Sequence, residues 1–291
     1  MNLPPDRLQT GPDATPLAQD LAYCLEKAAP EGSTGYYTLR FAPAHLRDAL
    51  LALAALQCEL DAVVEQCSEL RVAEGKLAYW SEELGRVGAR RASHPVARAL
   101  STLLDDQQLR REDVQALLTS THDRLRTPQV LDEQELMDLC RLGAGRIGRI
   151  IARLYQRGDR DQALAGEAAA AVERVRLLQA PQRAGQPAHT GVPRDALVEL
   201  KVDRAAFDRG ADGPGIDSLQ ATLMRRCLDH LDALGPQRGS DATRLPPPLL
   251  SRVRIARREL DNGIRRQRRL PQPLLPISRL WICWRDARRE R

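Results

Sequence analysis

The chain has 291 residues, with 44 lysines and arginines against 39 acidic residues and a net charge of +5. Hydrophobic residues make up 43% and aromatic residues only 3%, which is typical of a soluble protein with a sizeable core and favours helices over sheets. The longest apolar runs fall well short of the roughly 20 residues of a membrane span, and the N-terminus has no signal-peptide pattern, so these features exclude a transmembrane protein and predict a cytoplasmic one.

The first 16 residues are a predicted flexible leader, because they contain four prolines, a glycine and no apolar periodicity. The predicted domain covers residues 17–288, where apolar residues recur at helical spacing and strand signals are nearly absent. Helices are predicted near 35–37 and at 16–29, 43–70, 70–88, 96–104, 113–126, 132–157, 166–180, 194–207, 216–234, 249–268 and 277–288. Proline and glycine predict loops at 181–193 and 235–248. The expected fold class is all-α, a single domain of about ten helices.

The helix predicted for 43–70 carries the first candidate site. Its apolar residues follow one stripe, and Asp61 and Glu65 lie four residues apart, one turn from each other on a single face. Mg²⁺ prefers oxygen ligands and is often held by one or two carboxylates together with substrate phosphates. The pair therefore predicts a metal site, with a merely solvated acidic face as the alternative.

Three glycines, Gly143, Gly145 and Gly148, interrupt the strongly periodic segment 132–157. Each should weaken a helix by roughly 1 kcal/mol relative to alanine, so a close approach of another helix or of a ligand is expected there. A helical pattern and not a strand precedes them, which disfavours a dinucleotide loop.

The C-terminal segment 251–291 is strongly basic, with thirteen arginines against four acids, about +9. Together with Trp281 and Trp284 it predicts contact with an anionic membrane surface, with the protein then peripheral at the inner membrane. The alternative is that the arginines form salt bridges and the tryptophans pack in the core. Aromatic residues do not interleave with the arginines, so specific nucleic-acid recognition is not expected.

Several segments, taken in order, resemble the squalene/phytoene synthase family: GYYTLRFAPAHLRDALLALAALQ, KLAYWSEELGRV followed by HPVARAL, VPRDAL, and LPISRLWICWRDARR. The resemblance covers residues 17–288. It implies an isoprenoid-synthase-type helical bundle around a central cavity, in which two aspartate-rich helices face each other. In that family the two motifs hold Mg²⁺ ions that bind the diphosphates of two prenyl donors.

The first of these motifs falls on Asp61 and Glu65, so one of its two aspartates is a glutamate here. Cys58 stands where the family has an arginine that contacts diphosphate, and Ala54 stands where it has a tyrosine. The resemblance therefore implies a weakened first metal site.

The second motif is missing. Its two carboxylate positions correspond to Ala180 and Ala184, with Gln179 in place of an arginine, and no acid lies between Arg174 and His189. Removing one well-placed electrostatic partner can lower a rate by about 10² to 10³, and here a whole carboxylate pair is absent.

The leading hypothesis is a family member with lost or much reduced catalysis, which binds an isoprenoid or lipid-like molecule or acts as an assembly or interaction factor with a protein partner. The alternative is an active Mg²⁺-dependent prenyltransferase with an altered site, in which Asp61, Glu65 and Glu173 hold metal while Arg174 or Arg176 holds phosphate.

Four residues are candidates for substrate binding: Tyr36, Tyr37, Glu173 and Arg176. For the two tyrosines a core packing role is the alternative. His94, which precedes a proline, is expected to cap a helix or to pack. The six cysteines show no metal spacing and are expected to be reduced thiols.

Overall fold

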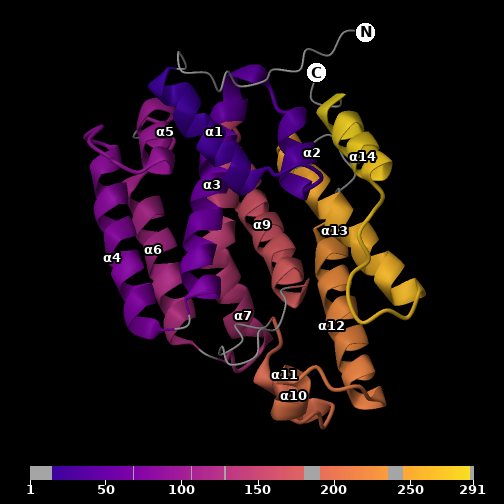
Figure 1. The fold of residues 1–291 in the computed structure, drawn as a ribbon. Helices are drawn as coiled ribbons and strands as arrows, with labels where there is room; N and C mark the ends of the chain where they lie inside the picture. Colours follow the sequence, from indigo (N-terminus) through magenta and orange to yellow (C-terminus); the bar gives the residue numbers. More distant parts are fainter. Residues whose placement is uncertain are drawn as a thin grey trace.

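The computed structural model describes residues 15–67, 69–105, 107–127, 129–179, 191–234 and 245–288. The leader expected at 1–16 lies outside the described residues except for Thr15, whose side chain accepts a hydrogen bond from Ala18 N, and Pro16, the first residue of α1. The described residues contain helices and no strand, which confirms the expected all-α fold class (Figure 1).

The helices pack as one bundle, and the two ends of the described chain, α1 and α14, lie toward the same end of it in Figure 1. Their bounds are α1 Pro16–Ala28, α2 Thr34–Arg40, α3 Ala44–Gln66, α4 Leu70–Val87, α5 Pro95–Leu103, α6 Arg111–Arg126, α7 Glu133–Cys140, the π-helical turn η1 Arg141–Gly145, α8 Arg146–Leu154, α9 Asp159–Gln179, α10 Arg194–Glu199, α11 Arg204–Asp208, α12 Pro214–Ala233, α13 Pro247–Arg265 and α14 Pro276–Arg288.

Helix α3 is at the centre of the first half of the bundle. It packs against α1, α2, α4, α5, α6 and α8, and the apolar stripe through Leu50, Leu53, Leu56 and Leu60 is buried. Because neighbouring helices pack against this stripe from several sides, α3 is held in place. The polar residues toward its C-terminal end therefore have fixed positions.

Helix α9 joins the two halves of the bundle. Ala165 and Ala169 belong to the core around α3, whereas Ala168, Ala171 and Val175 belong to the core formed with α12 and α13. A helix that is buried on opposite faces must be apolar or small-sided all round, which explains its run of alanines.

The close helix approach expected at the glycines is confirmed. A Cβ on Gly148 of α8 would lie 2.3 Å from the carbonyl oxygen of Ala165 and 2.7 Å from Cβ of Ala169, both on α9. Only glycine lets the two backbones come this near.

The prediction of one continuous α-helix over 132–157 is wrong in one respect, because the π-helical turn η1 separates α7 from α8. A π-turn widens the helix and frees backbone groups from the regular ladder. The Ser120 hydroxyl of α6 donates a hydrogen bond to the Leu139 carbonyl just before the turn (3.3 Å), so a neighbouring helix supplies a partner where the ladder changes.

Three other boundaries differ from the prediction. Helix α9 begins at Asp159 and not near Gly166, the segment 194–207 forms two short helices, and α13 begins at Pro247 within the predicted loop. Proline is tolerated in the first turn of a helix, where its missing N–H has no intrahelical partner to lose.

The turn between α4 and α5 is built on the fully buried carboxylate of Glu83. It accepts hydrogen bonds from Ser93 N (2.7 Å), Ser93 Oγ (2.7 Å) and His94 N (2.8 Å). Burial alone would raise the pKa of Glu83, but these hydrogen bonds and that from Arg86 outweigh it and lower the pKa to about 2. His94 Nδ1 accepts a hydrogen bond from Val96 N, so the expected capping role is confirmed.

Candidate functional site

Helices α3, α8, α9 and α13 enclose a cavity of about 250 Å³ in the middle of the bundle. Ile147 and Ile151 of α8 and Ala169 and Val172 of α9 give it apolar walls. Small-molecule sites in proteins occupy roughly 300–1,000 Å³, so this space lies just below that range. The expected central cavity is present.

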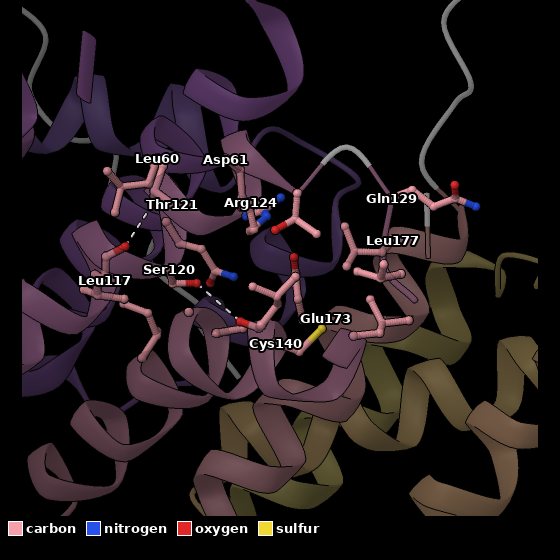
Figure 2. A pocket seen from close by; sticks show the side chains of 18 residues that line it. Leu60, Asp61, Leu117, Ser120, Thr121, Arg124, Gln129, Cys140, Glu173 and Leu177 are labelled. Carbon is pink, nitrogen blue, oxygen red and sulfur yellow. Dashed lines mark hydrogen bonds and ion pairs between the residues drawn. The ribbon is translucent and has the colours of Figure 1, made fainter. Parts of the chain in front are cut away.

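A smaller hollow of about 50 Å³ adjoins this cavity between α3, α6 and α7. Both spaces are lined by Gln57, Asp61, Ala144, Ile147 and Glu173. Figure 2 shows Asp61, Arg124 and Glu173 on the wall of the smaller hollow. Its walls therefore include part of the first candidate site.

One stripe of α3 faces the larger cavity. Ala54, Cys58 and Asp61 line it, and Glu65 follows one turn later, so the stripe changes from apolar to acidic toward the C-terminal end of the helix. The acidic end is where the resemblance places the first metal motif.

Two arginines reach the acidic pair from other helices. Arg124 of α6 forms an ion pair with Asp61 and lies 3.5 Å from Glu65 through Nη2. Arg176 of α9 lies 2.8 Å from Glu65 Oε1 through Nη1 and 3.5 Å from Asp61 Oδ2 through Nη2. Each carboxylate therefore has both guanidinium groups beside it.

Glu173 adds a third carboxylate to this group. It lies one turn before Arg176 on α9 and accepts hydrogen bonds from Arg176 Nε (2.8 Å) and Nη2 (2.7 Å). Burial raises the pKa of Glu173 and the charge of Asp61 adds to the effect, although Arg176 and Arg124 oppose it. We call Asp61, Glu65, Glu173, Arg124 and Arg176 the five-residue ion cluster.

The five-residue ion cluster does not have the form of a metal site. Among the described residues no group of three or more histidine, cysteine, aspartate or glutamate side chains is placed to hold a metal ion. Mg²⁺ demands near-octahedral oxygen ligands, whereas Asp61 accepts a hydrogen bond from Arg124 and Glu65 lies within ion-pair distance of Arg176. The metal role of these two residues stays a prediction.

A family model described as squalene/phytoene synthase matches residues 28–281. The chain belongs to the squalene/phytoene synthase family. A comparison with curated proteins gave no match.

Two solved structures share the fold of this family member. A squalene synthase, HpnC, from Alicyclobacillus acidocaldarius has a TM-score of 0.65 and 19% identity, over 89% of this chain and 97% of that one. A dehydrosqualene synthase in complex with ligand has a TM-score of 0.74 and 16% identity, over 95% of this chain and 99% of that one. At these identities the likeness shows the fold.

Within this squalene/phytoene synthase fold, Cys58 and Gln179 both line the cavity. The Cys58 side chain is exposed to the cavity, where the surrounding protein limits its solvation and raises the pKa of the thiol to about 11, and Asp61 adds to this effect. A neutral thiol and an amide therefore stand where the family resemblance leads one to expect arginines. Ala180 and Ala184, the positions that the resemblance assigns to the second motif, lie outside the described residues.

Arg174, named above as a phosphate-binding candidate, is not among the residues that line either cavity. Its buried side chain forms an ion pair with Glu133 and contacts Cys227 Sγ on α12. Arg176 alone of that pair lines the larger cavity.

Tyr36 and Tyr37 pack edge to face, with ring centroids 5.3 Å apart, in a cluster with Ile282 of α14. Neither is among the residues lining the cavity, whereas Thr34 and Gly35 of the same helix are. A role in binding substrate stays a prediction for the two tyrosines.

Sequence reasoning missed Arg124 and Arg252, which come from helices that carry no acidic motif. Arg124 follows the buried residues Leu117 and Thr121 by seven and three positions, and Arg252 follows the buried Leu249 by three. A charged residue on the buried stripe of a helix was the available signal.

Proposed function

We propose that this member of the squalene/phytoene synthase family binds an isoprenoid or other lipid-like molecule in its central cavity and has lost, or nearly lost, the metal-assisted ionisation of prenyl diphosphates. The observation that carries the proposal is the pairing of Arg124 and Arg176 with Asp61 and Glu65. The apolar walls of the cavity support an apolar chain as its occupant.

The electrostatic argument concerns the departure of diphosphate. A metal ion stabilises the charge that develops on a leaving group by several kcal/mol. Here two guanidinium groups already lie beside the carboxylates of Asp61 and Glu65, and a divalent cation added between them would be repelled by both guanidinium groups. Moving the arginines away would also leave Asp61 in a poorly solvated position without a partner, which costs several kcal/mol.

Pyrophosphate release tests the proposal. Purified protein is incubated with Mg²⁺ and farnesyl diphosphate, and the variant Asp61→Ala is measured beside it. We expect the two proteins to release pyrophosphate at the same low rate. Clear turnover by the wild type that disappears in Asp61→Ala would defeat the proposal.

A second candidate is an active Mg²⁺-dependent prenyltransferase with an altered site. Glu173 favours it, because this buried acid faces Asp61 and Glu65 across Arg176 and brings the number of carboxylates to three. The arginines would then serve phosphate oxygens, which they bind in a bidentate manner. Turnover that requires Glu173 as well as Asp61 would favour this candidate.

An anionic membrane surface is a further proposed partner. Ile277, Trp281 and Trp284 follow one another at spacings of four and three on α14, and 68%, 47% and 38% of their surfaces are exposed. Arg285 lies over the ring of Trp281 and Arg288 over that of Trp284, at 4.6 Å from each centroid. Exposed aromatic and basic side chains on one helix suit the interface between lipid and water.

Other features bear on the same partner. Arg254, Arg257 and Arg279 form ion pairs within the fold, so much of the basic segment is neutralised by the protein itself. Among the described helices none is long and apolar enough to cross a membrane. The role as an assembly or interaction factor stays a prediction.

A further inference from the structure

Arg252 of α13 lines the central cavity and forms no hydrogen bond or ion pair with any described residue. This distinguishes it from its neighbours on the same helix, since Arg254 pairs with Asp286 and Arg257 with Asp232. Its side chain is half-buried and lies on the wall of the cavity.

The other charged side chains on the cavity wall have partners. Asp61, Glu173 and Arg176 belong to the five-residue ion cluster. Glu259 lies 2.7 Å from Arg279 and also accepts a hydrogen bond from Leu274 N. Among the described residues that line this cavity, Arg252 is therefore the charged side chain without a hydrogen bond or ion pair, and Glu173 is the acid that acts on it from a distance.

Cys58 locates Arg252 relative to the ion cluster. The guanidinium groups of Arg252 and Arg176 both act on the Cys58 thiol, and Cys58 lies one turn before Asp61 on α3. Arg252 is therefore within electrostatic reach of Cys58 on α3 and of Glu173 in the cluster, and it lines the same cavity as the apolar walls. A chain lying against those walls can bring its polar end to Arg252.

An unpaired cation in this position is costly for the empty protein. Burial lowers the pKa of Arg252, although Cys58 and Glu173 act in the opposite direction. A guanidinium is matched best by a carboxylate or phosphate group, which can accept two parallel N–H bonds. An anionic group brought by a ligand would supply the missing partner.

We propose that Arg252 binds the single anionic head, a carboxylate or a phosphate monoester, of an apolar molecule whose chain occupies the central cavity. The inference rests on the proposed function and adds the chemical class of the ligand. A longer polyphosphate fits less well, because its further charges would face Asp61 and Glu173, in a cluster that holds three acids against two arginines.

Three probes with the same C15 chain test this inference: farnesyl monophosphate, farnesoic acid and farnesol. We expect the wild type to bind one or both acidic probes about tenfold to a hundredfold more tightly than farnesol, as for a hydrogen bond to a charged group. In Arg252→Leu the acidic probes should lose this advantage while the affinity for farnesol is kept. The matched control is Arg265→Leu, at the end of the same helix, where the side chain is 74% exposed, and it should behave as the wild type.

The thermal midpoint gives a second readout. Because Arg252→Leu removes an unpaired charge, we expect the empty variant to be at least as stable as the wild type. If this variant does not fold, Arg252→Gln carries the same test of affinity. Equal affinity of the wild type for all three probes, or an acidic preference that survives in Arg252→Leu or Arg252→Gln, would overturn the inference and leave the cavity-binding proposal standing. Failure of all three probes to bind would overturn both.

Discussion

Two arginines from different helices, Arg124 of α6 and Arg176 of α9, reach the same two carboxylates on α3. The pairing compensates Asp61 and Glu65 within the fold, with no requirement for an added cation. It also shares each charge between several neighbours, so the five residues depend on one another. Energies of such networks are not additive, and a single substitution there disturbs all of its members.

Glu83 shows that a segment resembling the family can serve the stability of the fold. The motif KLAYWSEELGRV resembles the family, and the structure places its Glu83 under the turn that leads to His94. This carboxylate fixes a turn and lies outside the two cavities. Its similarity to the family therefore reflects the scaffold.

Glu83→Gln should lower the free energy of unfolding by about 2 kcal/mol, because the amide replaces one acceptor oxygen with a donor that faces buried donors. Chemical denaturation at neutral pH measures this. Glu82→Gln, on the exposed neighbour, is the control and should stay within about 0.5 kcal/mol of the wild type. An equal loss in both variants would contradict the role given to Glu83.

The pH dependence of stability follows from the same residue. The pKa of Glu83 falls from its ordinary 4.5 to about 2 in the folded protein. Its stabilising contribution is therefore fully present above about pH 5 and is lost as the pH falls toward 2. Denaturation curves between pH 6 and pH 3 should show a smaller decline in stability for Glu83→Gln than for the wild type. Parallel curves would contradict this.

At the scale of elements, the contact between α8 and α9 decides the width of the cavity. Gly148 lies against the backbone of Ala165, and the neighbouring residues Ile147 and Ala169 line the cavity. A larger residue at position 148 would push the two helices apart, so both the stability and the shape of the cavity depend on it.

Gly148→Ala should destabilise the protein by about 1–3 kcal/mol, the usual range for overpacking a core. Gly75→Ala is the matched control, because Gly75 lies inside α4 with nothing within 4 Å of an added Cβ. In an open helix position alanine is better than glycine by about 1 kcal/mol, so the control should be more stable than the wild type. Thermal unfolding of both variants checks the contrast, and a neutral Gly148→Ala would contradict the close approach.

The helices themselves were predictable from the sequence, because each buries an apolar stripe at helical spacing. The stripe of α3 and the glycine contact of α8 are examples. The π-turn at Arg141–Gly145 was not predictable, since it depends on how α6 and α9 pack around it. The start of α13 at Pro247 was missed because a proline run resembles a loop.

The candidate site was predictable only in part. Asp61, Glu65, Glu173 and Arg176 were named from the sequence, and the structure brings these four together. Arg124 and Arg252 lie far from them along the chain, and no local pattern links a residue of α6 or α13 to one of α3. The positions of Arg124 and Arg252 beside the cavities are a property of the tertiary fold.

At the scale of the whole molecule, the exposed stripe of α14 allows a direct test of the proposed membrane contact. The double variant Trp281→Ser/Trp284→Ser should float less with phosphatidylglycerol vesicles than the wild type. The variant can insert no tryptophan ring into the lipid and has no ring to hold Arg285 and Arg288 in place. Val198→Ser, on the exposed face of α10, is the control and should float as the wild type does. Equal flotation of all three proteins, or none by the wild type, would contradict the proposal.

The overall fold matches the family, whereas the side chains at the acidic end of the cavity differ from what the resemblance leads one to expect. The bundle, the central cavity and the match over residues 28–281 belong to the squalene/phytoene synthase family. At the acidic end of the cavity, guanidinium groups stand beside the carboxylates that the resemblance assigns to metal. The proposed loss of metal-assisted chemistry depends on this one replacement, of a metal ion by the guanidinium groups of Arg124 and Arg176.

Calorimetric titration of Mg²⁺ into the protein, in the presence of inorganic pyrophosphate, tests that replacement most directly. Wild type and Asp61→Ala are titrated under the same conditions. If Arg124 and Arg176 hold the acidic pair, both proteins should give the same heats as a protein-free titration of Mg²⁺ into pyrophosphate, with no saturable Mg²⁺ site on the protein. Saturable binding to the wild type that Asp61→Ala abolishes would contradict the account.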